Sequence, residues 1–347
     1  MNSRARACLA AGIAIAIAIA ASLPAQAQTA ASRDSVSLYG VLDEYAGSIR
    51  RSNSPGRTTA LNSGGMTTSY WGVRGTEDLG GGLSSFFALE SFFQVDTGTS
   101  GRTTADPLFS RNAYVGLGGR YGQVGLGRQT NPMFTVTGTF NPFGVSANLS
   151  PVMLHIWSAN YNRAVLGDSV WNNSVQYNSP NLAGFRASAS YALGEVTNEA
   201  GVRNFNVTVN YDKGPFAAVV SAQRAETGLG FTTSIKKQDA QMMGLSYDLD
   251  FVKLFGQYFH TDTPDIQTKT RTGQLGFAVP VGPGRIMATV ARTEREVAGA
   301  ETTRTTTGLG YDHYLSKRTD LYAVYLLDKL TAFDRQSSLA LGVRHRF

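Results

Sequence analysis

The sequence predicts an all-β protein, a sixteen-stranded antiparallel transmembrane β-barrel. The 347 residues include 38 Gly, 15 Tyr and 18 Phe. Polar and apolar residues alternate along many short segments. Beyond residue 27, no stretch stays apolar for the roughly 18 residues that a spanning helix needs. These three observations are typical of a barrel with one face toward lipid and the other toward water.

The start of the chain predicts a secretory signal peptide, residues 1–27, which is cleaved near Ala27. Arg4 and Arg6 form its basic start, residues 9–23 are apolar, and an Ala-Gln-Ala signal ends it. This order is that of an exported protein, and the apolar stretch is short for a spanning helix. Cys8 is the single cysteine, so after cleavage we expect no thiol, disulfide or cysteine metal site.

The alternation is clearest in residues 202–211. Apolar side chains take one parity (Phe205, Val207, Val209, Tyr211), and amides and hydroxyls take the other (Asn204, Asn206, Thr208, Asn210). Successive residues of a strand point to opposite faces of the sheet. Because lipid cannot satisfy an open strand edge, a sheet that spans the membrane has to close into a barrel.

We expect sixteen strands, an even number, as a barrel with both termini on the periplasmic side requires. They begin near residues 35, 66, 83, 108, 121, 169, 184, 203, 215, 239, 250, 270, 284, 303, 318 and 337. A sheet of this size encloses a space too wide for side chains to fill, so we expect water inside it.

The connections alternate between short turns and long loops, which orients the barrel. Short turns belong to the periplasmic side and long loops to the exterior. The short turns fall at residues 78–82, 118–122, 212–215, 281–284 and 315–318, and the long loops at 48–65, 98–107, 194–202, 227–238 and 261–270. Residues 130–168 are much longer and lack clean alternation, so we interpret them as a functional loop.

A set of ordered motifs spans residues 28–347, the single barrel domain. They are VSLYGVLD (36–43), GTEDLGGGL (75–83), LES (89–91), RNAYVGL (111–117), GLGRQ (125–129), NSVQYNSP (173–180) and LGVRHRF (341–347). Together they resemble the general diffusion porins of Gram-negative bacteria, especially the betaproteobacterial type. This resemblance implies a third loop, about residues 130–168, that folds inward to narrow the pore.

The resemblance also implies a function and partners. It implies a homotrimer in the outer membrane of a Gram-negative bacterium, a channel for passive diffusion of small hydrophilic solutes and anions. Contact with outer-membrane lipid and lipopolysaccharide is expected, and the barrel-assembly machinery is expected to read Phe347. Pro142-Phe143-Gly144 resembles the turn that such inward loops carry. The carboxylate common beside that turn is missing, because Asn141 and Phe143 take the neighbouring places.

The resemblance further places one wall of the constriction, where such porins carry a ladder of arginines. Arg111 stands at a ladder position, whereas Tyr70 and Val170 stand where arginine is frequent. Arg74 shares the parity of Tyr70 and should face the lumen. Glu90, on the adjoining strand, should pair with Arg111 and fix its orientation. The alternative for Arg111, Arg74 and Glu90 is a solvated side chain without a role in selectivity.

The charge of the narrowest ring sets the barrier for ions of each sign. Residues 107–167 contain no Asp or Glu but contain Arg111, Arg120, Arg128 and Arg163. We therefore expect a weak to moderate anion preference, with Arg163 among the pore-lining residues. The parity of Arg128 places it on the outer face, where a lone arginine toward lipid is costly, so we assign it to a subunit interface.

Two further groups have structural explanations. We expect most aromatic side chains on the lipid-facing parity, as anchors at the membrane interfaces: Tyr39, Tyr177, Tyr191, Tyr211, Tyr247, Phe277, Tyr311 and Tyr325. The alternative for the Pro-Phe-Gly motif is an ordinary turn.

Rival functions make different demands on the sequence. A barrel hydrolase needs a nucleophile with a base in reach, but the four histidines are dispersed, so we expect no enzyme, no cofactor and no metal site. A barrel adhesin or receptor needs larger loops or a plugged lumen. A substrate-specific channel differs only in constriction detail and stays open. The net charge of +6 comes without a basic cluster, so we expect no nucleic-acid binding.

Overall fold

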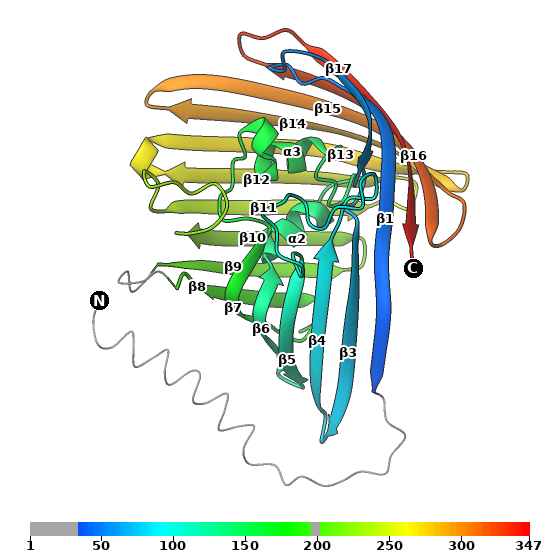
Figure 1. Ribbon diagram of the computed structural model, residues 1–347, viewed down its shortest axis with the longest axis vertical. Helices are drawn as coiled ribbons and strands as arrows, with labels where there is room; N and C mark the ends of the chain where they lie inside the picture. The colour runs from blue at the N-terminus through cyan, green and yellow to red at the C-terminus, as the bar shows by residue number, and fades with distance from the viewer. Residues whose placement is uncertain (1–33, 196–201) are drawn as a thin grey trace. The chain divides into compact units, whose positions relative to one another are not determined.

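The computed structural model describes residues 34–195 and 202–347, and the expected signal peptide lies outside them. The described residues form one sheet of 17 strands with two short α-helices (Figure 1). None of their helices is long and apolar enough to cross a membrane.

The strands begin close to the predicted residues. They are β1 Ser35–Ile49, β2 Thr58–Ser63, β3 Tyr70–Gly80, β4 Leu83–Phe92, β5 Asn112–Gly119, β6 Gly122–Thr130, β7 Val170–Asn178, β8 Phe185–Leu193, β9 Arg203–Lys213, β10 Phe216–Ala225, β11 Gln238–Asp248, β12 Lys253–Thr263, β13 Thr268–Val281, β14 Gly284–Val297, β15 Ala300–Tyr314, β16 Thr319–Leu330 and β17 Gln336–Arg346. From β3 to β17 each strand pairs antiparallel with the next.

The last strand closes the sheet on the first. β17 pairs antiparallel with β1 from Val41↔Arg346 to Ser48↔Leu339. Beyond the ladder, the amide of Gly40 donates to the carbonyl of Phe347 at 3.2 Å, and the amide of Phe347 donates back at 3.1 Å. The barrel therefore has no open edge for lipid to meet.

The 17 segments occupy sixteen positions around the barrel, as predicted, because β2 and β3 share one. β3 pairs with the first half of β1, and β2 pairs with its second half. The prediction that residues 48–65 form only a loop is wrong for its last part, which is β2. The backbone of the second half of β1 needs a hydrogen-bonding partner in the membrane, and residues 58–63 supply it.

The turn between β2 and β3 folds around a buried carboxylate. Asp43 has no exposed surface, and its two oxygens accept the amide hydrogens of Gly65, Met66 and Thr67 at 2.7–3.0 Å. Tyr322 OH donates to the same carboxylate at 2.6 Å. This turn delays the start of β3 from the predicted residue 66 to residue 70.

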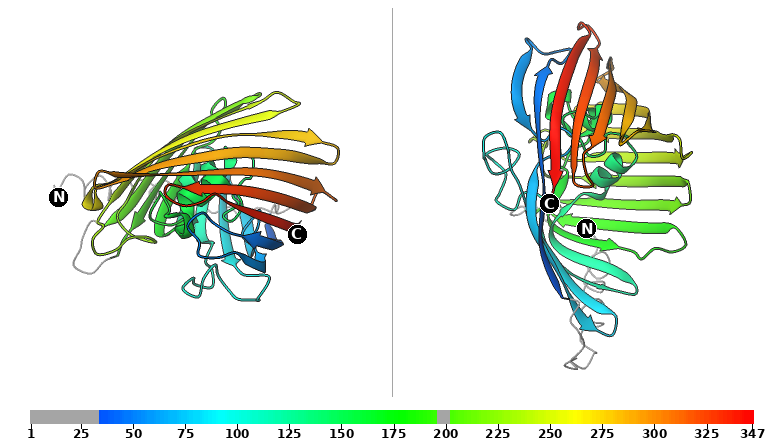
Figure 2. Two further views of the ribbon diagram at one scale, coloured as in Figure 1. Left: turned by 90° about the horizontal axis from the view of Figure 1, so that it is seen from above. Right: turned by 90° about the vertical axis from the view of Figure 1, so that its right-hand side faces the viewer.

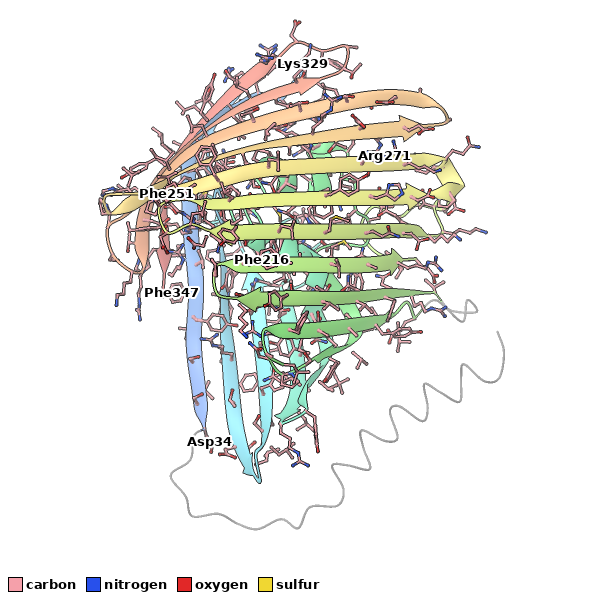
Figure 3. The ribbon with its side chains drawn as sticks, turned by 180° about the vertical axis from the view of Figure 1, so that it is seen from behind. Asp34, Phe216, Phe251, Arg271, Lys329 and Phe347 are labelled. Carbon is pink, nitrogen blue, oxygen red and sulfur yellow. The ribbon has the colours of Figure 1, made fainter. Side chains whose placement is uncertain are left out.

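The two faces of the sheet follow the predicted alternation. On β17, Leu339, Leu341 and Val343 are exposed on the outer face, whereas Ser338 and Arg344 are buried on the inner face. Figure 3 places Phe216 and Phe251, beside short turns, at the end of the strands opposite to Arg271. The apolar outer face and the alternating connections fit a barrel in a membrane.

One of the aromatic residues expected toward lipid points the other way. Tyr39 lies in register with Gly72, which is in register with the lumen-facing Glu90. Its hydroxyl donates to Glu90 Oε1. The expectation for Tyr39 is therefore wrong, because the apolar parity of β1 belongs to its neighbours Leu38 and Leu42, which are exposed.

Residues 131–169 form the inward loop, which carries α2 Pro132–Thr139, α3 Pro151–Trp157 and the 3-10 turn η1 Ala159–Tyr161. α2 contacts β8–β11 and α3 contacts β13–β15, and the views of Figure 2 place both helices inside the ring of strands. Asn131 caps α2 by accepting the amide hydrogen of Met133 at 2.9 Å. The loop thus covers the inner face of the second half of the barrel.

Two apolar clusters hold the loop against this wall. Met133, Phe140, Val152 and Ile156 pack against side chains of β10, β11, β12 and β14. Phe143, Leu149 and Leu154 pack against Met66, Tyr45 of β1 and side chains of β12–β14, β16 and β17. Polar anchors add to them, since Gln257 Nε2 donates to the carbonyls of Thr137 and Phe140 at 3.1 and 2.6 Å. These carbonyls at the end of α2 lack helical partners, so the wall satisfies them.

Candidate channel constriction

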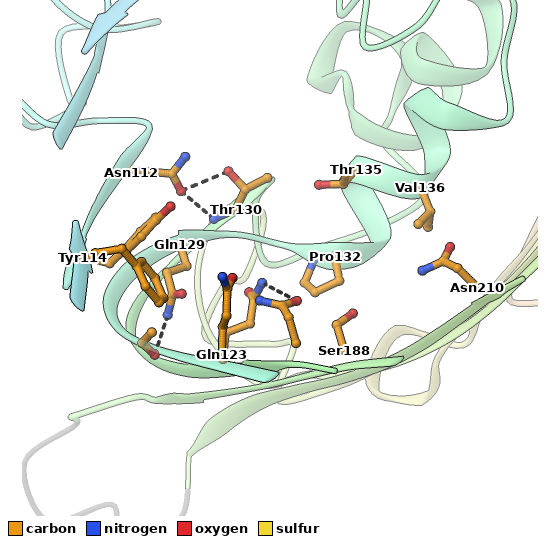
Figure 4. A pocket seen from close by; sticks show the side chains of 14 residues that line it. Asn112, Tyr114, Gln123, Gln129, Thr130, Pro132, Thr135, Val136, Ser188 and Asn210 are labelled. Carbon is orange, nitrogen blue, oxygen red and sulfur yellow. Dashed lines mark hydrogen bonds between the residues drawn. The ribbon is translucent and has the colours of Figure 1, made fainter. Parts of the chain in front are cut away.

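The inward loop leaves the inner faces of the first half of β1 and of β3–β7 uncovered, and we call this surface the bare wall. A cavity of about 520 Å³ lies against β1 and β3–β6. A second cavity of about 310 Å³ extends from β4 to β9 beneath the start of α2 (Figure 4). Both cavities are lined by Phe86, Tyr114 and Gln123. The space inside the barrel therefore lies between the loop and the bare wall.

Glu90 is the centre of a polar cluster on the bare wall. Its carboxylate accepts hydrogen bonds from Tyr39 OH, Arg111 Nη1 and Asn112 Nδ2. The side chain of Glu90 is only 5% exposed, and that of Arg111 is 28% exposed. The ion pair expected between Glu90 and Arg111 is therefore present, and it offsets much of the arginine charge.

Arg111 reaches the lumen although its strand parity is that of the outer face. The residue precedes β5, so its side chain is not bound by the alternation of that strand. Its amide donates to the carbonyl of Glu90 at 3.1 Å, which places the guanidinium beside the Glu90 carboxylate. The guanidinium also lies over the ring of Tyr70, with 4.1 Å between Cζ and the ring centroid.

Arg74, two positions along β3 from Gly72, differs from Arg111 in its partners. Its guanidinium lies over the ring of Tyr39 at 4.5 Å, and its Nε donates to Ser37 Oγ at 3.4 Å. Among the described residues it has no carboxylate partner. Arg74 is exposed to the cavity of about 520 Å³ and is the cation lining it that has no carboxylate partner.

The turn of the inward loop is anchored in the wall and does not present its side chains to the cavities. Phe143 is 1% exposed, and Asn141 and Pro142 are buried. Asn141 Oδ1 accepts the amide hydrogen of Phe143 at 3.1 Å, and its Nδ2 donates to Ser150 Oγ at 2.9 Å. Gly144 takes the left-handed conformation, φ +59°, that ends the turn. These four residues position the loop.

Two other expected pore-lining residues lie away from the Arg111 cluster. Val170 is buried and pairs with Thr130 at the root of the loop. Arg163 follows η1 and lies beside Gly230, where an added Cβ would meet Arg163 Cδ at 3.4 Å. The residues that the structure brings together on the bare wall are Arg111, Arg74, Glu90 and Tyr70, joined by Tyr39.

Comparisons with known proteins match this architecture. The profile of a family described as Gram-negative porin matches residues 14–331. Outer membrane porin protein 32 of Delftia acidovorans is 30% identical, with 92% of this chain and 95% of the relative covered. An outer membrane porin protein of Bordetella pertussis is 26% identical, with 93% and 96% covered. The chain belongs to the Gram-negative porin family.

Solved structures agree with this membership. An anion-selective porin from Comamonas acidovorans superposes with a TM-score of 0.77 and 29% identity, covering 91% of this chain and all of that one. A loop-deletion variant of the outer membrane protein OmpT of Vibrio cholerae superposes with a TM-score of 0.69 at 17% identity, covering 90% and 99%, and shares the fold. The protein is thus an outer-membrane porin with a closed β-barrel.

In this porin, Arg128 lies on the outer side of the barrel at the root of the inward loop. It pairs with Ala113 in the ladder, next to a register shift at Gly127. Its Nε and Nη2 donate to the carbonyl of Ser110 at 2.9 and 2.7 Å, and its Nη1 donates to Asn172 Oδ1. Its partners are carbonyl and amide oxygens, so the positive charge is hydrogen-bonded but not neutralised.

The porin also clamps the root of its inward loop with charges that the sequence analysis missed. Arg102 bridges Asp106 and Asp168, each at 2.9 Å. Burial raises the pKa of both carboxyl groups, but hydrogen bonds and charge from Arg102 outweigh it and hold each pKa below its ordinary value. A signal existed, because these two aspartates bracket the acid-free residues 107–167.

His155 is a second missed residue, buried where α3 meets the wall. Its Nδ1 and Nε2 each lie 2.8 Å from a threonine hydroxyl, Thr293 on β14 and Thr306 on β15. Thr306 donates its own hydrogen to Asp328 at 2.8 Å, so it accepts from Nε2–H. Burial, reinforced by the charge of Arg304, lowers the pKa of His155 to about 3. The neutral imidazole therefore connects loop and wall.

Proposed function

We propose that this porin is a general diffusion channel for small hydrophilic solutes, with a weak anion preference. The observation that carries the proposal is Arg74, an exposed guanidinium on the bare wall without a carboxylate partner among the described residues. A fixed charge at a narrow point lowers the barrier for ions of the opposite sign. The similar porin from Comamonas acidovorans is anion-selective, which supports the same sign.

The preference is weak because most of the wall charge is offset. Glu90 pairs with Arg111, and Tyr70 and Val170 stand where the resemblance leads us to expect arginine. The one carboxylate of the inward loop, Asp168, is paired with Arg102, and residues 107–167 have neither Asp nor Glu to oppose Arg74. Arg74 therefore remains as the cation without a carboxylate partner that lines the cavity of about 520 Å³.

The test is the reversal potential in a salt gradient across a planar bilayer. We expect native protein to favour chloride over potassium. Arg74→Gln should remove most of the preference, and Arg111→Ala should shift it further toward cations, because Glu90 then faces the lumen without its ion-pair partner. Arg186→Gln is the matched control, because Arg186 faces the lumen on β8 in register with Asn210 but lines neither of the two cavities, so it should change little. Cation selectivity in the native protein would overturn the proposed sign.

We further propose that the chain works as a homotrimer after removal of residues 1–27. The support is the hydrogen-bonded but un-neutralised Arg128 on the outer side, a place that suits a subunit contact better than lipid. Phe347 would serve as the assembly signal, and outer-membrane lipid and lipopolysaccharide would surround the trimer. A monomeric mass in mild detergent, after subtraction of bound detergent, would contradict the trimer.

We infer a channel and not an enzyme. The buried His155 is occupied by two threonine hydroxyls, and His345 lies at the end of β17 beside Thr319. His155 is buried, so a solute does not reach its ring, and among the described residues no third group orients the ring of His345. The second candidate function is a substrate-specific channel, and the aromatic side chains of the bare wall favour it.

A further inference from the structure

Four aromatic rings line the cavity at the bare wall. Tyr39 and Tyr70 form one edge-to-face pair with centroids 6.2 Å apart, and Phe86 and Tyr114 form another at 6.1 Å. All four line the cavity of about 520 Å³. The phenyl ring of Phe86 can donate no hydrogen bond to the water inside, so diffusion of hydrophilic solutes alone does not explain its place.

In the strand register, Ala88 separates Arg74 from the ring pair Phe86 and Tyr114. Ala88 on β4 is in register with Arg74 on one side and Tyr114 on the other. Neighbouring strands lie about 4.8 Å apart, so the backbones of Arg74 and Tyr114 are separated by roughly 10 Å. Phe86 is the next inward residue on β4, and Ala88 has no long side chain to fill the space between them. The guanidinium of Arg74 leans toward β1, and the cavity of about 520 Å³ that it lines together with Phe86 and Tyr114 has room for a single six-membered ring with one substituent.

The guanidinium of Arg74 is held in an orientation that suits the binding of an anion. Its Nε is used by Ser37 Oγ, and its face lies on Tyr39, which fixes its plane. Nη1 and Nη2 have no hydrogen-bond partner among the described residues. A planar guanidinium with two free N–H groups matches a carboxylate bidentately.

The ring pair is prepared to bind an aromatic group. Phe86 and Tyr114 are both half-buried, so each offers part of its ring surface to the cavity. Aromatic rings prefer offset or edge-to-face neighbours, and such a contact adds stabilisation beyond the area it buries. A solute with a carboxylate and a ring would therefore contact both sides of Ala88, whereas acetate would contact only Arg74.

We propose that the bare wall carries a weak binding subsite for small aromatic carboxylates, with Arg74 holding the carboxylate and Phe86 and Tyr114 holding the ring. The proposal rests on the function proposed above, because the subsite lies in the same channel. Small aromatic carboxylates would then bind in the channel during passage, whereas other small hydrophilic solutes would diffuse through it freely. A site of this kind is occupied only briefly, since conduction requires that a bound solute leaves.

The experiment titrates benzoate into one chamber of a planar bilayer that contains the native porin in potassium chloride. We expect a saturable reduction of the single-channel current by benzoate. Acetate has the carboxylate without a ring and should give no saturable reduction. Cyclohexanecarboxylate has nearly the same size and charge but no π face, so its half-blocking concentration should be about 2- to 10-fold higher than that of benzoate.

Variants assign the two contacts. Phe86→Leu keeps an apolar side chain of similar volume and should raise the half-blocking concentration of benzoate about 2- to 10-fold, toward that of cyclohexanecarboxylate. Arg74→Gln should abolish the saturable block by both acids. Arg186→Gln removes a different lumen-facing arginine and should leave the block unchanged. Should a variant yield no channels, the comparison of the acids on native protein decides.

The outcomes separate the subsite from the channel itself. Absence of ion conductance by the reconstituted native protein would overturn the proposed function. Conductance with equal weak effects of benzoate, cyclohexanecarboxylate and acetate would leave the channel intact and overturn the subsite. Saturable block that survives Arg74→Gln and Phe86→Leu would place any aromatic site elsewhere and equally overturn this one.

Discussion

Two arginines that lie on tyrosine rings show how differently the two walls of the barrel are built. On the bare wall, Arg74 lies over Tyr39 at 4.5 Å, exposed and without a carboxylate. On the loop-covered wall, Arg304 of β15 lies over Tyr161 of the inward loop at 4.0 Å and is buried. Arg304 is also bound bidentately by Asp328 at 2.9 and 2.6 Å. The same side-chain pair faces the cavity in one place and attaches the inward loop in the other.

The contrast extends to the neutral polar residues. Inward threonines and amides of β9–β16 such as Asn206, Thr208, Thr272 and Thr306 have no exposed surface, and they bond to one another or to the loop. On the bare wall, Gln123 and Asn178 line a cavity. Polarity at an inward position therefore marks water contact on one side of the barrel and a satisfied buried network on the other.

The largest expected effect is on the covered wall. Arg304→Gln would leave the buried Asp328 without its bidentate partner and would remove the charge that lies on Tyr161. Removing one member of a buried ion pair costs about 3–5 kcal/mol, so the barrel should lose its β-sheet circular-dichroism signal at a clearly lower temperature in detergent. Noisier single-channel current should accompany this loss, because η1 loses its contact. A native-like melting temperature would show that the pair does not hold the loop.

The sequence predicts those features of the two walls that follow from the alternation of polar and apolar residues, and it does not predict those that depend on contacts between distant residues. Lipid and water impose a period of two on every spanning strand, so alternation locates strands such as β9 and β17 within a residue or two of their observed starts. The inward face of Arg74 follows from the same rule. The sequence did not predict β2, because its six residues, Thr58–Ser63, are too few to show a clear alternation. The need for this strand follows only from the second half of β1, which would otherwise lack a hydrogen-bonding partner.

The remaining differences come from packing and from strand ends. The prediction that Tyr39 takes the lipid-facing parity is wrong, because the exposed neighbours Leu38 and Leu42 define the outer parity of β1. Arg111 reaches the lumen because it stands just outside β5. The burial of Phe143 depends on Gly310 of β15, whose Cβ position would lie 2.9 Å from the phenyl ring. Nothing local in the sequence connects residues so far apart.

A smaller effect is expected from acid, and again only on the covered wall. His155 has a folded-state pKa of about 3 because of burial, below the ordinary value of about 6.5. Between these values a released loop binds more protons than a docked one, so docking is strongest above pH 6.5 and weakens as the pH falls. The loss should reach about 2 kcal/mol at pH 5.

The measurement is single-channel noise between pH 7 and pH 5. The single-channel current through the native protein should fluctuate more at pH 5 than at pH 7. His155→Gln, which keeps a polar group for the threonine hydroxyls and cannot be protonated, should lose this dependence. His345→Gln, an exposed control at the end of β17, should keep it. Equal pH dependence in native protein and His155→Gln would assign the effect to other groups.

The smallest expected effect on stability comes from Arg74→Gln on the bare wall, the same substitution as at Arg304. Its guanidinium is solvated and holds one hydrogen bond of 3.4 Å to Ser37 Oγ, so the free energy of unfolding should change by no more than about 0.5 kcal/mol. The melting temperature in detergent checks this directly. A loss as large as that of Arg304→Gln would mean that the bare wall is also a structural surface. A native-like melting temperature with altered ion selectivity would separate the wall that carries solutes from the wall that carries the loop.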